Sequence, residues 1–295
     1  MREDALLPKP ASSSFEQAAA TPLAAVTALQ ALRTVGKVEQ GTAVLINGAA
    51  GGVGTFAVQI AKALGADVTA VASSRNLDQA RALGADRVID YTRGGFAVHG
   101  ERYDVIVAVN GYHPLSVYGR ALKPGGTYVM VGGTPRQWVE AVLLGPLRSR
   151  GDKKFARVNA APALSGPAGE RKMRTNLKDL AYVAELLESG DVVPVIDRRY
   201  SLNQVPEAIR YMEEGHARGK VVITIYPAAP RRRAWGKASS TSSRPPARAG
   251  SRRCRELEQV RAAGERSAVV FVEAARRAPP NPCSRPRRRA GLYPC

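Results

Sequence analysis

The chain has 295 residues, of which 44% are hydrophobic, and its formal net charge is +19. This length allows one large domain or two modest ones, and the hydrophobic content suffices for a buried core. No stretch reaches the roughly 18 uncharged apolar residues that a membrane span needs, and the first residues lack the apolar core of a signal peptide. We therefore expect no membrane partner and a cytoplasmic location.

The positive charge is concentrated near the C-terminus. Residues 227–295 carry 16 Arg and one Lys against four Glu, together with nine of the 20 prolines. This composition predicts a disordered Arg/Pro-rich tail, in which the apolar residues within 253–277 form at most a transient helix or strand. A nucleic-acid partner is disfavoured because the tail lacks interleaved aromatic residues. The composition also fits a GC-rich reading frame that encodes no selected function.

A metal site is not expected. All three cysteines lie in the tail, so residues 1–226 offer no thiolate ligand. The histidines, His99, His113 and His216, lie far apart in sequence and show no ligand spacing.

Helical signals open the ordered part of the chain. Ser14 and Gln17 have the spacing of a capping box. Thr21 is placed to cap a second helix that has Pro22 in its first turn.

Short β-rich runs then alternate with helices. Strands are predicted at residues 43–47, 67–72, 87–90, 104–109 and 127–131. Gly65 ends a helix over 53–64, and Gly84 ends a second helix that Asn76 caps. This rhythm predicts an α/β fold with a doubly wound parallel sheet of the Rossmann type.

After residue 147 the rhythm breaks. A basic stretch over 148–169 contains one expected strand at 155–158. Helices over 176–189 and 202–215 and a last strand over 220–225 follow.

The glycine-rich segment after the first expected strand carries chemistry. Residues 44–54 read VLINGAAGGVG and lead into a helix, which is the order of a dinucleotide-binding unit. Gly51 lets the backbone approach a pyrophosphate, Gly54 allows close packing, and the helix N-terminus supplies free N–H groups. The predicted cofactor-binding residues of this loop are Ala50, Gly51, Gly52, Val53 and Gly54.

The end of the second strand indicates which cofactor is bound. It carries no acid to hold a ribose 2′-hydroxyl, but it has Ser73, Ser74 and Arg75, whose hydroxyl and guanidinium groups suit a 2′-phosphate. We expect NADPH in preference to NADH. The alternative is that both serines form a turn and that Arg75 is solvated.

Several further motifs, in this order, resemble one family. They are LGAD at 64–67 and 83–86, VIDY at 88–91, LKPGG at 122–126 and GHARGKVV at 215–222. With the glycine loop, they resemble zinc-independent quinone oxidoreductases of the medium-chain dehydrogenase/reductase superfamily, over about residues 5–226.

The resemblance implies a domain plan. Residues 1–20 would be a remnant of the N-terminal catalytic domain, and 21–147 the dinucleotide-binding Rossmann domain. Residues 148–226 would be the segment that returns to the catalytic domain, followed by the tail. Family members carry a GroES-like β-barrel of roughly a hundred residues before the Rossmann domain, and we expect most of it to be missing. Its loss would expose an apolar face on 148–226 and favour a homodimer.

The resemblance also implies site residues. Thr27 would approach the nicotinamide carboxamide, Tyr91 the adenosine ribose, and Lys220 would complete the cleft. The nicotinamide half would be lined by Val109, Asn110, Gly111 and Gly132. Each has an ordinary structural alternative, such as a satisfied helix threonine at Thr27 or a turn at Asn110. No catalytic residue is identified.

The expected function is that of an NADPH-dependent oxidoreductase without zinc. It would transfer a hydride to a quinone or a conjugated carbonyl compound, with weak activity if truncated. The alternatives are a non-catalytic NADPH-binding module and a degenerate fragment.

Overall fold

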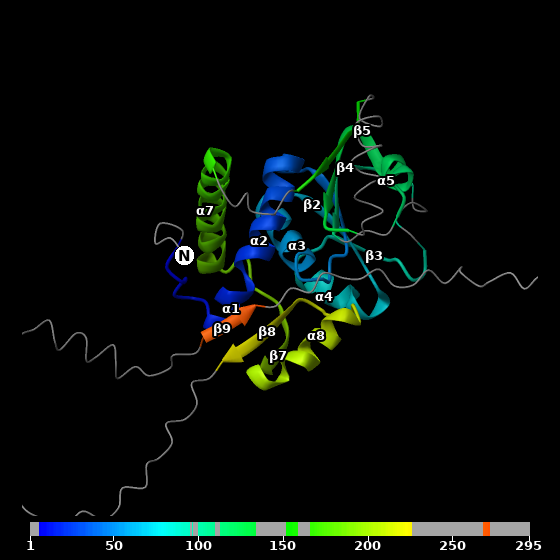
Figure 1. The fold of residues 1–295 in the computed structure, drawn as a ribbon. Helices are drawn as coiled ribbons and strands as arrows, with labels where there is room; N and C mark the ends of the chain where they lie inside the picture. Colours follow the sequence, from blue (N-terminus) through cyan, green and yellow to red (C-terminus); the bar gives the residue numbers. More distant parts are fainter. Residues whose placement is uncertain are drawn as a thin grey trace, which may run out of the picture.

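The computed structural model describes residues 6–94, 96, 100–109, 113–133, 152–158, 166–225 and 268–271. These residues form a six-stranded sheet and a three-stranded sheet with flanking helices (Figure 1). The predicted disordered tail, residues 227–295, lies mostly outside the described residues.

The larger sheet has the strand order β3-β2-β1-β4-β5-β6, and every neighbouring pair is parallel. This is the strand order of a Rossmann fold, so the predicted doubly wound sheet is confirmed. Its strands are β1 (Ala43–Asn47), β2 (Asp67–Ala72), β3 (Arg87–Asp90), β4 (Tyr103–Val109), β5 (Leu122–Val131) and β6 (Lys154–Arg157).

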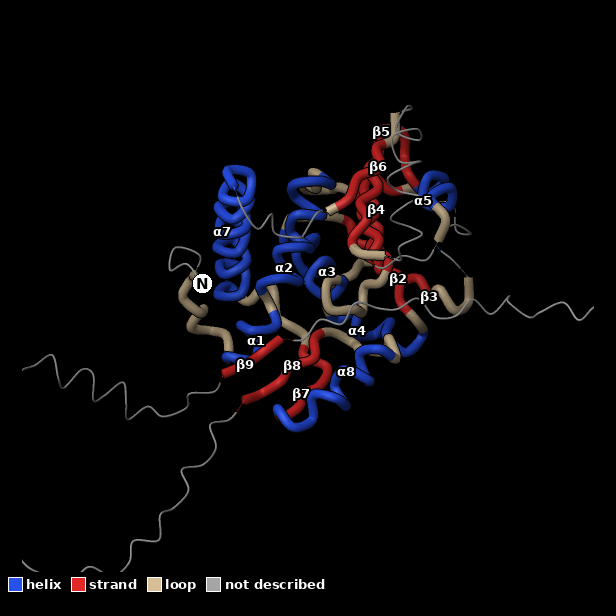
Figure 2. Tube along the Cα trace, in the orientation of Figure 1, coloured by secondary structure: helices blue, strands red, loops and turns tan. Residues whose placement is uncertain are grey.

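Helices cover both faces of this sheet. Figure 2 shows α2, α3 and α7 on one side and α5 on the other. The helices are α1 (Phe15–Ala20), α2 (Pro22–Leu29) with its π-helical continuation η2 (Gln30–Gly36), α3 (Gly54–Ala63), η3 (Ser74–Asn76), α4 (Leu77–Ala82), α5 (Leu115–Ala121) and α7 (Gly166–Ser189).

Residues of β1 alternate between two cores. Val44 and Ile46 join the core beneath α2, α3 and α7, whereas Leu45 joins the core beneath α5. All three are fully buried. Successive residues of a strand point to opposite faces, so a continuous apolar run can fill both layers.

The smaller sheet has the order β7-β8-β9 and lies below α1 in Figure 1. β7 (Ile196–Ser201) is parallel to β8 (Lys220–Ile225), and β9 (Ala268–Phe271) is antiparallel to β8. Between β7 and β8 the chain forms η5 (Leu202–Gln204) and α8 (Val205–Glu213). Ala208 of α8 packs against Val221 and Ile223 of β8.

Some local expectations need correction. Ser14 and Gln17 do form the capping box. Thr21 makes no cap, because its Oγ1 donates to the carbonyl of Gln17 at 2.7 Å. Asn76 also makes no cap: its Nδ2 donates to Oγ of Ser73 at 3.1 Å, and its Oδ1 accepts from no described donor.

The LKPGG segment lies inside a strand. Leu122 pairs with Tyr103 and Thr127 with Val105, so the residues between Leu122 and Thr127 form a bulge in β5. Gly125 adopts φ +77° there. A bulge accommodates a glycine at positive φ without ending the strand.

The larger sheet also includes a strand from the segment after residue 147. β6 pairs in parallel with β5. Helix α7 begins at Gly166, ten residues before the expected start at 176, and it packs on α2. Strand β7 was not expected, and β9 lies in the part of the tail for which only a transient helix or strand was expected.

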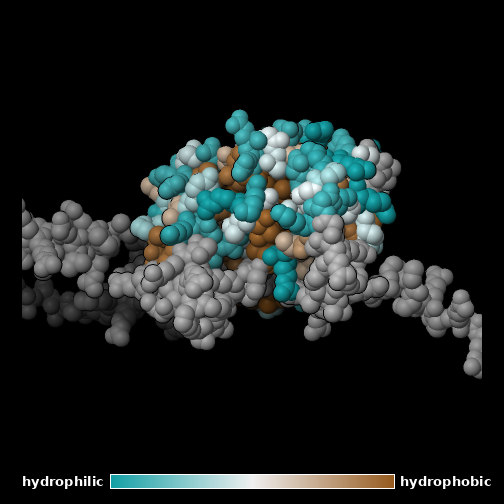
Figure 3. Space-filling model, turned by 90° about the horizontal axis from the view of Figure 1, so that it is seen from above, coloured by the Kyte–Doolittle hydropathy of each residue, from teal (hydrophilic) through white to brown (hydrophobic). Residues whose placement is uncertain are grey.

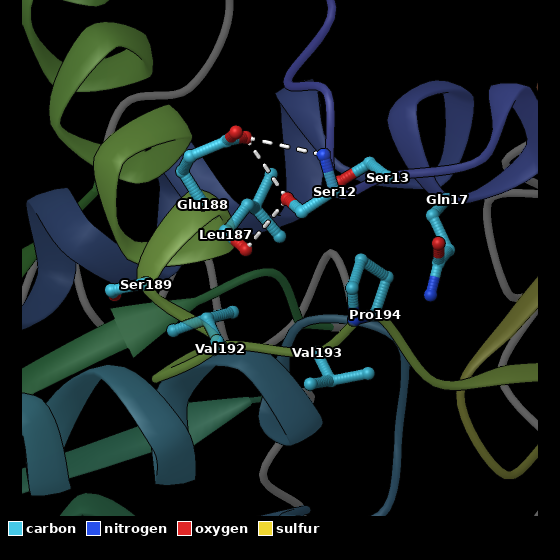
Figure 4. A pocket seen from close by; sticks show the side chains of 10 residues that line it. Ser12, Ser13, Gln17, Leu187, Glu188, Ser189, Val192, Val193 and Pro194 are labelled. Carbon is cyan, nitrogen blue, oxygen red and sulfur yellow. Dashed lines mark hydrogen bonds between the residues drawn. The ribbon is translucent and has the colours of Figure 1, made fainter.

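The N-terminal segment contacts the end of α7 and the strand β7 that follows it. Oγ of Ser12 donates to the carbonyl of Leu187 and to Oε2 of Glu188, each at 3.0 Å, and Figure 4 shows these contacts at a small cleft. Nε of Arg199 pairs with Oε2 of Glu16 at 2.6 Å. Residues 1–20 and 148–226, which are distant in sequence, therefore lie in contact.

Among the residues whose burial the structure describes, most exposed large apolar side chains lie outside 148–226. Figure 3 shows brown, hydrophobic areas between polar side chains on the face in view. Within the described part of the chain the exposed large apolar residues are Leu6, Leu7, Phe15, Leu23, Tyr91, Val193 and Leu202. Only Val193 and Leu202 belong to the segment expected to drive dimerisation.

The side chain of Gln59 ties α3 to the segment before β7. Its Oε1 accepts from the backbone N–H of Val193 at 2.8 Å, and its Nε2 donates to the carbonyls of Val193 at 3.1 Å and Thr55 at 2.9 Å. Gln59 is 7% exposed. A buried amide that pairs with both backbone groups of one residue fixes that residue as a strand partner would.

We expect Gln59→Ala to lower the free energy of unfolding by about 2–4 kcal/mol, because buried hydrogen bonds are lost and the N–H of Val193 is left without its acceptor. Chemical denaturation measures this loss. Gln40→Ala, at an exposed glutamine, is the control and should stay within about 0.5 kcal/mol of the parent. A Gln59→Ala protein as stable as this control would show that the hydrogen bonds between Gln59 and Val193 do not stabilise the fold.

Candidate cofactor site

Backbone hydrogen bonds hold the loop between β1 and α3. The N–H groups of Gly48 and Ala49 both donate to the carbonyl of Val71 at 3.2 Å, which ties the loop to β2. Within the loop, Gly51 donates to Gly48 at 3.2 Å and Thr55 to Gly51 at 3.0 Å. The loop is therefore a fixed turn.

Two glycines of the loop are required by packing. Gly48 adopts φ +84°, and a Cβ there would lie 2.4 Å from the carbonyl oxygen of Val109. A Cβ on Gly54 would lie 2.1 Å from the carbonyl oxygen of Gly48. The sequence reasoning missed Gly48, although a glycine directly after an apolar strand is a signal for such a turn.

Gly51 and Gly52 have a different environment. A Cβ on Gly51 would have no neighbour closer than 3.6 Å, whereas a Cβ on Gly52 would lie 2.9 Å from Cδ and 3.3 Å from Nζ of Lys220. Lys220 is 4% exposed. The structure therefore brings Lys220, predicted only from the resemblance, directly over the glycine loop.

The first turn of α3 presents donors next to this ammonium group. Among the described residues, no acceptor pairs with the backbone N–H groups of Gly52, Val53 and Gly54. A helix N-terminus carries a partial positive charge, which the ammonium of Lys220 reinforces. These groups fit a pyrophosphate, whose oxygens accept hydrogen bonds and carry negative charge.

The backbone fixes the position of Lys220. Its N–H donates to the carbonyl of Val195 at 2.8 Å. Gly219 adopts φ +131°, and a Cβ there would lie 2.5 Å from the same carbonyl oxygen. The close approach of β8 to Val195 thus requires glycine immediately before the lysine.

The two serines after β2 differ in their hydrogen bonds. Ser73 Oγ accepts from Nδ2 of Asn76, so its own proton can be donated to a ligand. Ser74 Oγ donates to Oδ2 of Asp90 at 2.5 Å and lies 2.9 Å from Oγ1 of Thr92. The proton of Ser73 Oγ is thus available to a ligand, whereas the proton of Ser74 Oγ is donated to Asp90.

Arg75 is exposed at the start of the turn after β2, and it has no ion-pair partner within the described residues. Its guanidinium group can reach a ligand without first breaking a described salt bridge. The Oδ1 atom of Asn76, one residue on, is buried and has no hydrogen-bond partner among described atoms.

The remaining candidates fall into two groups. Tyr91, Val109 and Gly132 follow or end β3, β4 and β5, so they lie at the carboxyl edge of the sheet together with the glycine loop. Tyr91 is 55% exposed and its N–H donates to the carbonyl of Ala72 at 3.1 Å. Asn110 and Gly111 lie outside the described residues.

Thr27 matches its structural alternative. It lies on α2, and its Oγ1 donates to the carbonyl of Leu23 at 2.7 Å. Its side chain is therefore satisfied within the helix, although its Oγ1 retains lone pairs that can accept a further hydrogen bond.

An aromatic cluster supports the loop from the α5 side. Asn47, directly before Gly48, donates from Nδ2 to Oη of Tyr118 at 2.8 Å. Burial raises the pKa of Tyr118 to about 12, so its hydroxyl keeps its proton. The ring centroids of Phe96 and His113 lie 5.4 and 5.9 Å from that of Tyr118, and burial lowers the pKa of His113. Neither the hydroxyl nor the cluster was predicted, because it forms only in the folded chain.

The described residues contain neither a cluster of metal ligands nor a membrane-spanning helix. Within the described ranges, no three His, Cys, Asp or Glu side chains gather as metal ligands. None of the helices in that part of the chain is both long and apolar enough to cross a membrane.

Known proteins share this architecture. Residues 83–223 match the family model described as zinc-binding dehydrogenase. The chain is 36% identical over 239 residues to the mouse protein named NAD(P)H oxidoreductase RTN4IP1, mitochondrial, with 74% of this chain and 57% of that protein covered. It is 34% identical over 223 residues to tomato (Solanum lycopersicum) 2-methylene-furan-3-one reductase, with 74% and 49% covered. The chain thus spans about half the length of these curated relatives.

A solved structure also resembles this chain. The quinone oxidoreductase from Coxiella burnetii superposes with a TM-score of 0.60 at 30% sequence identity. The match covers 74% of this chain and 63% of that one.

Proposed function

Because the chain belongs to the medium-chain dehydrogenase/reductase superfamily, we propose that it is an NADPH-dependent oxidoreductase that reduces a quinone or a conjugated carbonyl compound. The observation that carries the proposal is the glycine loop with the buried Lys220 beside Gly52. The relatives named above as NAD(P)H oxidoreductase, methylene-furanone reductase and quinone oxidoreductase support the reaction class.

The chain's own groups would bind and orient the cofactor. The N–H groups of Gly52 and Val53 and the ammonium of Lys220 would hold the pyrophosphate. When bound, the reduced nicotinamide supplies a hydride to the acceptor. Val109 and Gly132 at the carboxyl edge would position that half of the cofactor and exclude water, and Thr27 Oγ1 would accept a hydrogen bond from its carboxamide.

The proposed preference for NADPH rests on the turn after β2. Arg75 would pair with the 2′-phosphate through its guanidinium group, and Ser73 would donate its hydroxyl proton. Tyr91, at the end of the neighbouring strand, would lie beside the adenosine ribose.

Arg75→Ala should weaken NADPH binding roughly 10- to 150-fold and leave NADH binding unchanged, because a hydrogen bond to a charged group is worth about 1.5–3 kcal/mol. Fluorescence titration with both cofactors measures the two affinities. Arg81→Ala, which removes an exposed arginine paired with Asp78, is the control for net charge. Equal weakening of both cofactors by Arg75→Ala would show that Arg75 does not contact the 2′-phosphate.

A second candidate is a module that binds NADPH without turnover. It is favoured by the described site, where the loop and Lys220 provide groups for a dinucleotide and no catalytic residue is identified. Turnover with a quinone distinguishes the two functions.

A further inference from the structure

Asp90, the last residue of β3, lies beside the turn after β2. Its Oδ2 accepts from Oγ of Ser74, and its Oδ1 accepts from the N–H of Thr92 at 2.9 Å and from Oγ1 of Thr92 at 2.6 Å. The carboxylate therefore organises the hydroxyls of Ser74 and Thr92, and Ser74 lies in sequence between the proposed 2′-phosphate ligands Ser73 and Arg75. It does so from a strand other than the one that usually supplies the acid.

The hydrogen bond to Asp90 sets what Ser74 offers to a ligand. A serine hydroxyl has one proton, and Ser74 donates it to the carboxylate. Ser74 Oγ can then offer a ligand only its lone pairs. Lone pairs can accept from a ribose 2′-hydroxyl, but they cannot donate to a phosphate oxygen.

The negative charge of Asp90 also disfavours a phosphate beside Ser74. Ser74 Oγ lies 2.5 Å from Oδ2, so a phosphate oxygen held by Ser73 and Arg75 against Ser74 Oγ, at about 3 Å, would lie at most about 5.5 Å from the carboxylate. Hydrogen bonds from Ser74 and Thr92 lower the pKa of Asp90, which keeps it charged at neutral pH. The nearest described cation, Nε of Arg93 at 3.8 Å, belongs to a side chain that is 85% exposed and screens the charge only in part.

We propose that Asp90 is a specificity-determining residue that limits the preference for NADPH, by taking the proton of Ser74 and by repelling the 2′-phosphate. The proposal rests on the proposed function, because it concerns the same cofactor site. Arg75 and Ser73 favour the 2′-phosphate, and Asp90 opposes them. The native chain should therefore use NADH more readily than a site with the same arginine and no acid.

The direct test is Asp90→Asn. The amide oxygen can keep the place of Oδ1 and accept from Thr92, while the amide nitrogen faces Ser74 and donates to it, which frees the serine proton. Repulsion between unit charges at about 5.5 Å in a water-like medium corresponds to a factor of roughly 4, and a dianionic phosphate doubles the energy. With screening, and with the added hydrogen bond from the freed proton of Ser74, NADPH affinity should rise roughly 5- to 20-fold. NADH affinity should stay within about twofold.

Two further variants sharpen the test. Asp78→Asn removes an acid of the same turn region whose side chain is fully exposed, so it controls for net charge and should leave the NADPH to NADH affinity ratio unchanged. In the parent protein, Ser73→Ala should weaken NADPH binding more than Ser74→Ala does, because only Ser73 has a proton to donate. This comparison does not depend on the folding of Asp90→Asn.

The outcomes separate this proposal from the proposed function. If Arg75→Ala weakens NADPH selectively but Asp90→Asn leaves the affinity ratio at the parent value, Asp90 does not set specificity and the proposed function stands. An Asp90→Asn protein that binds NADPH more weakly, or a larger effect at Ser74 than at Ser73, also overturns it. If the parent chain binds neither cofactor, the proposed function fails first.

Discussion

Replacing Gly51 with valine is expected to weaken NADPH binding by at least about 100-fold, because the branched side chain would occupy the space through which the pyrophosphate reaches the N–H groups of Gly52 and Val53. Two or more charge-assisted hydrogen bonds, each worth about 1.5–3 kcal/mol, would be lost. The fold should survive, since the nearest neighbour of a Cβ at Gly51 is 3.6 Å away.

Calorimetric titration with NADPH measures this effect. Gly119→Val is a matched control, because Gly119 lies on α5 and its Cβ would also have its nearest neighbour, Phe155, at 3.6 Å. The control should bind NADPH like the parent. A folded Gly51→Val protein with parental affinity would remove the glycine loop from the site.

Replacing Gly54 with alanine should instead prevent folding or cost at least about 4 kcal/mol of unfolding free energy. The added Cβ would lie 2.1 Å from the carbonyl oxygen of Gly48 and 2.8 Å from backbone atoms of Ala49. Neither residue can move away easily, because both donate to the carbonyl of Val71.

Denaturant unfolding tests this prediction, with Gly51→Ala as the comparison. Gly51→Ala should cost less than about 1 kcal/mol, because its Cβ meets only an ordinary contact. Equal stability of the two variants would show that α3 does not depend on close packing at Gly54.

Local patterns predicted the Rossmann unit well. The apolar run of β1, the glycine turn and α3 follow directly in sequence, and the bounds of β1, β2, β3 and β8 agree with expectation. Such segments combine strand-forming residues with turn residues at fixed offsets, so their structure is specified locally.

Features that depend on distant contacts could not be predicted. β7 has little apolar alternation and exists through its pairing with β8. The hydrogen bond between Gln59 and Val193 joins positions far apart in the chain. The hydrogen bond between Ser74 and Asp90 forms only when β2 and β3 lie side by side. For this reason, the sequence alone predicted that Ser74 donates to the 2′-phosphate.

Lys220 is an intermediate case. The sequence alone gave no reason to place it at the glycine loop, and only the family resemblance did so. The structure supplies the physical link, since β8 carries Lys220 to within contact of Gly52. A lysine at the start of an apolar strand such as β8 can indicate a functional site. Lysine is rarely buried unless a structural or functional group pairs with it.

The most direct test of the account is the oxidation of NADPH by the full chain in the presence of a quinone, with the Gly51→Val protein as the blank. We expect turnover above the uncatalysed rate for the parent and none above it for the variant. Tight NADPH binding by the parent without turnover on either a quinone or a conjugated ketone would contradict the proposed reductase and favour the non-catalytic module.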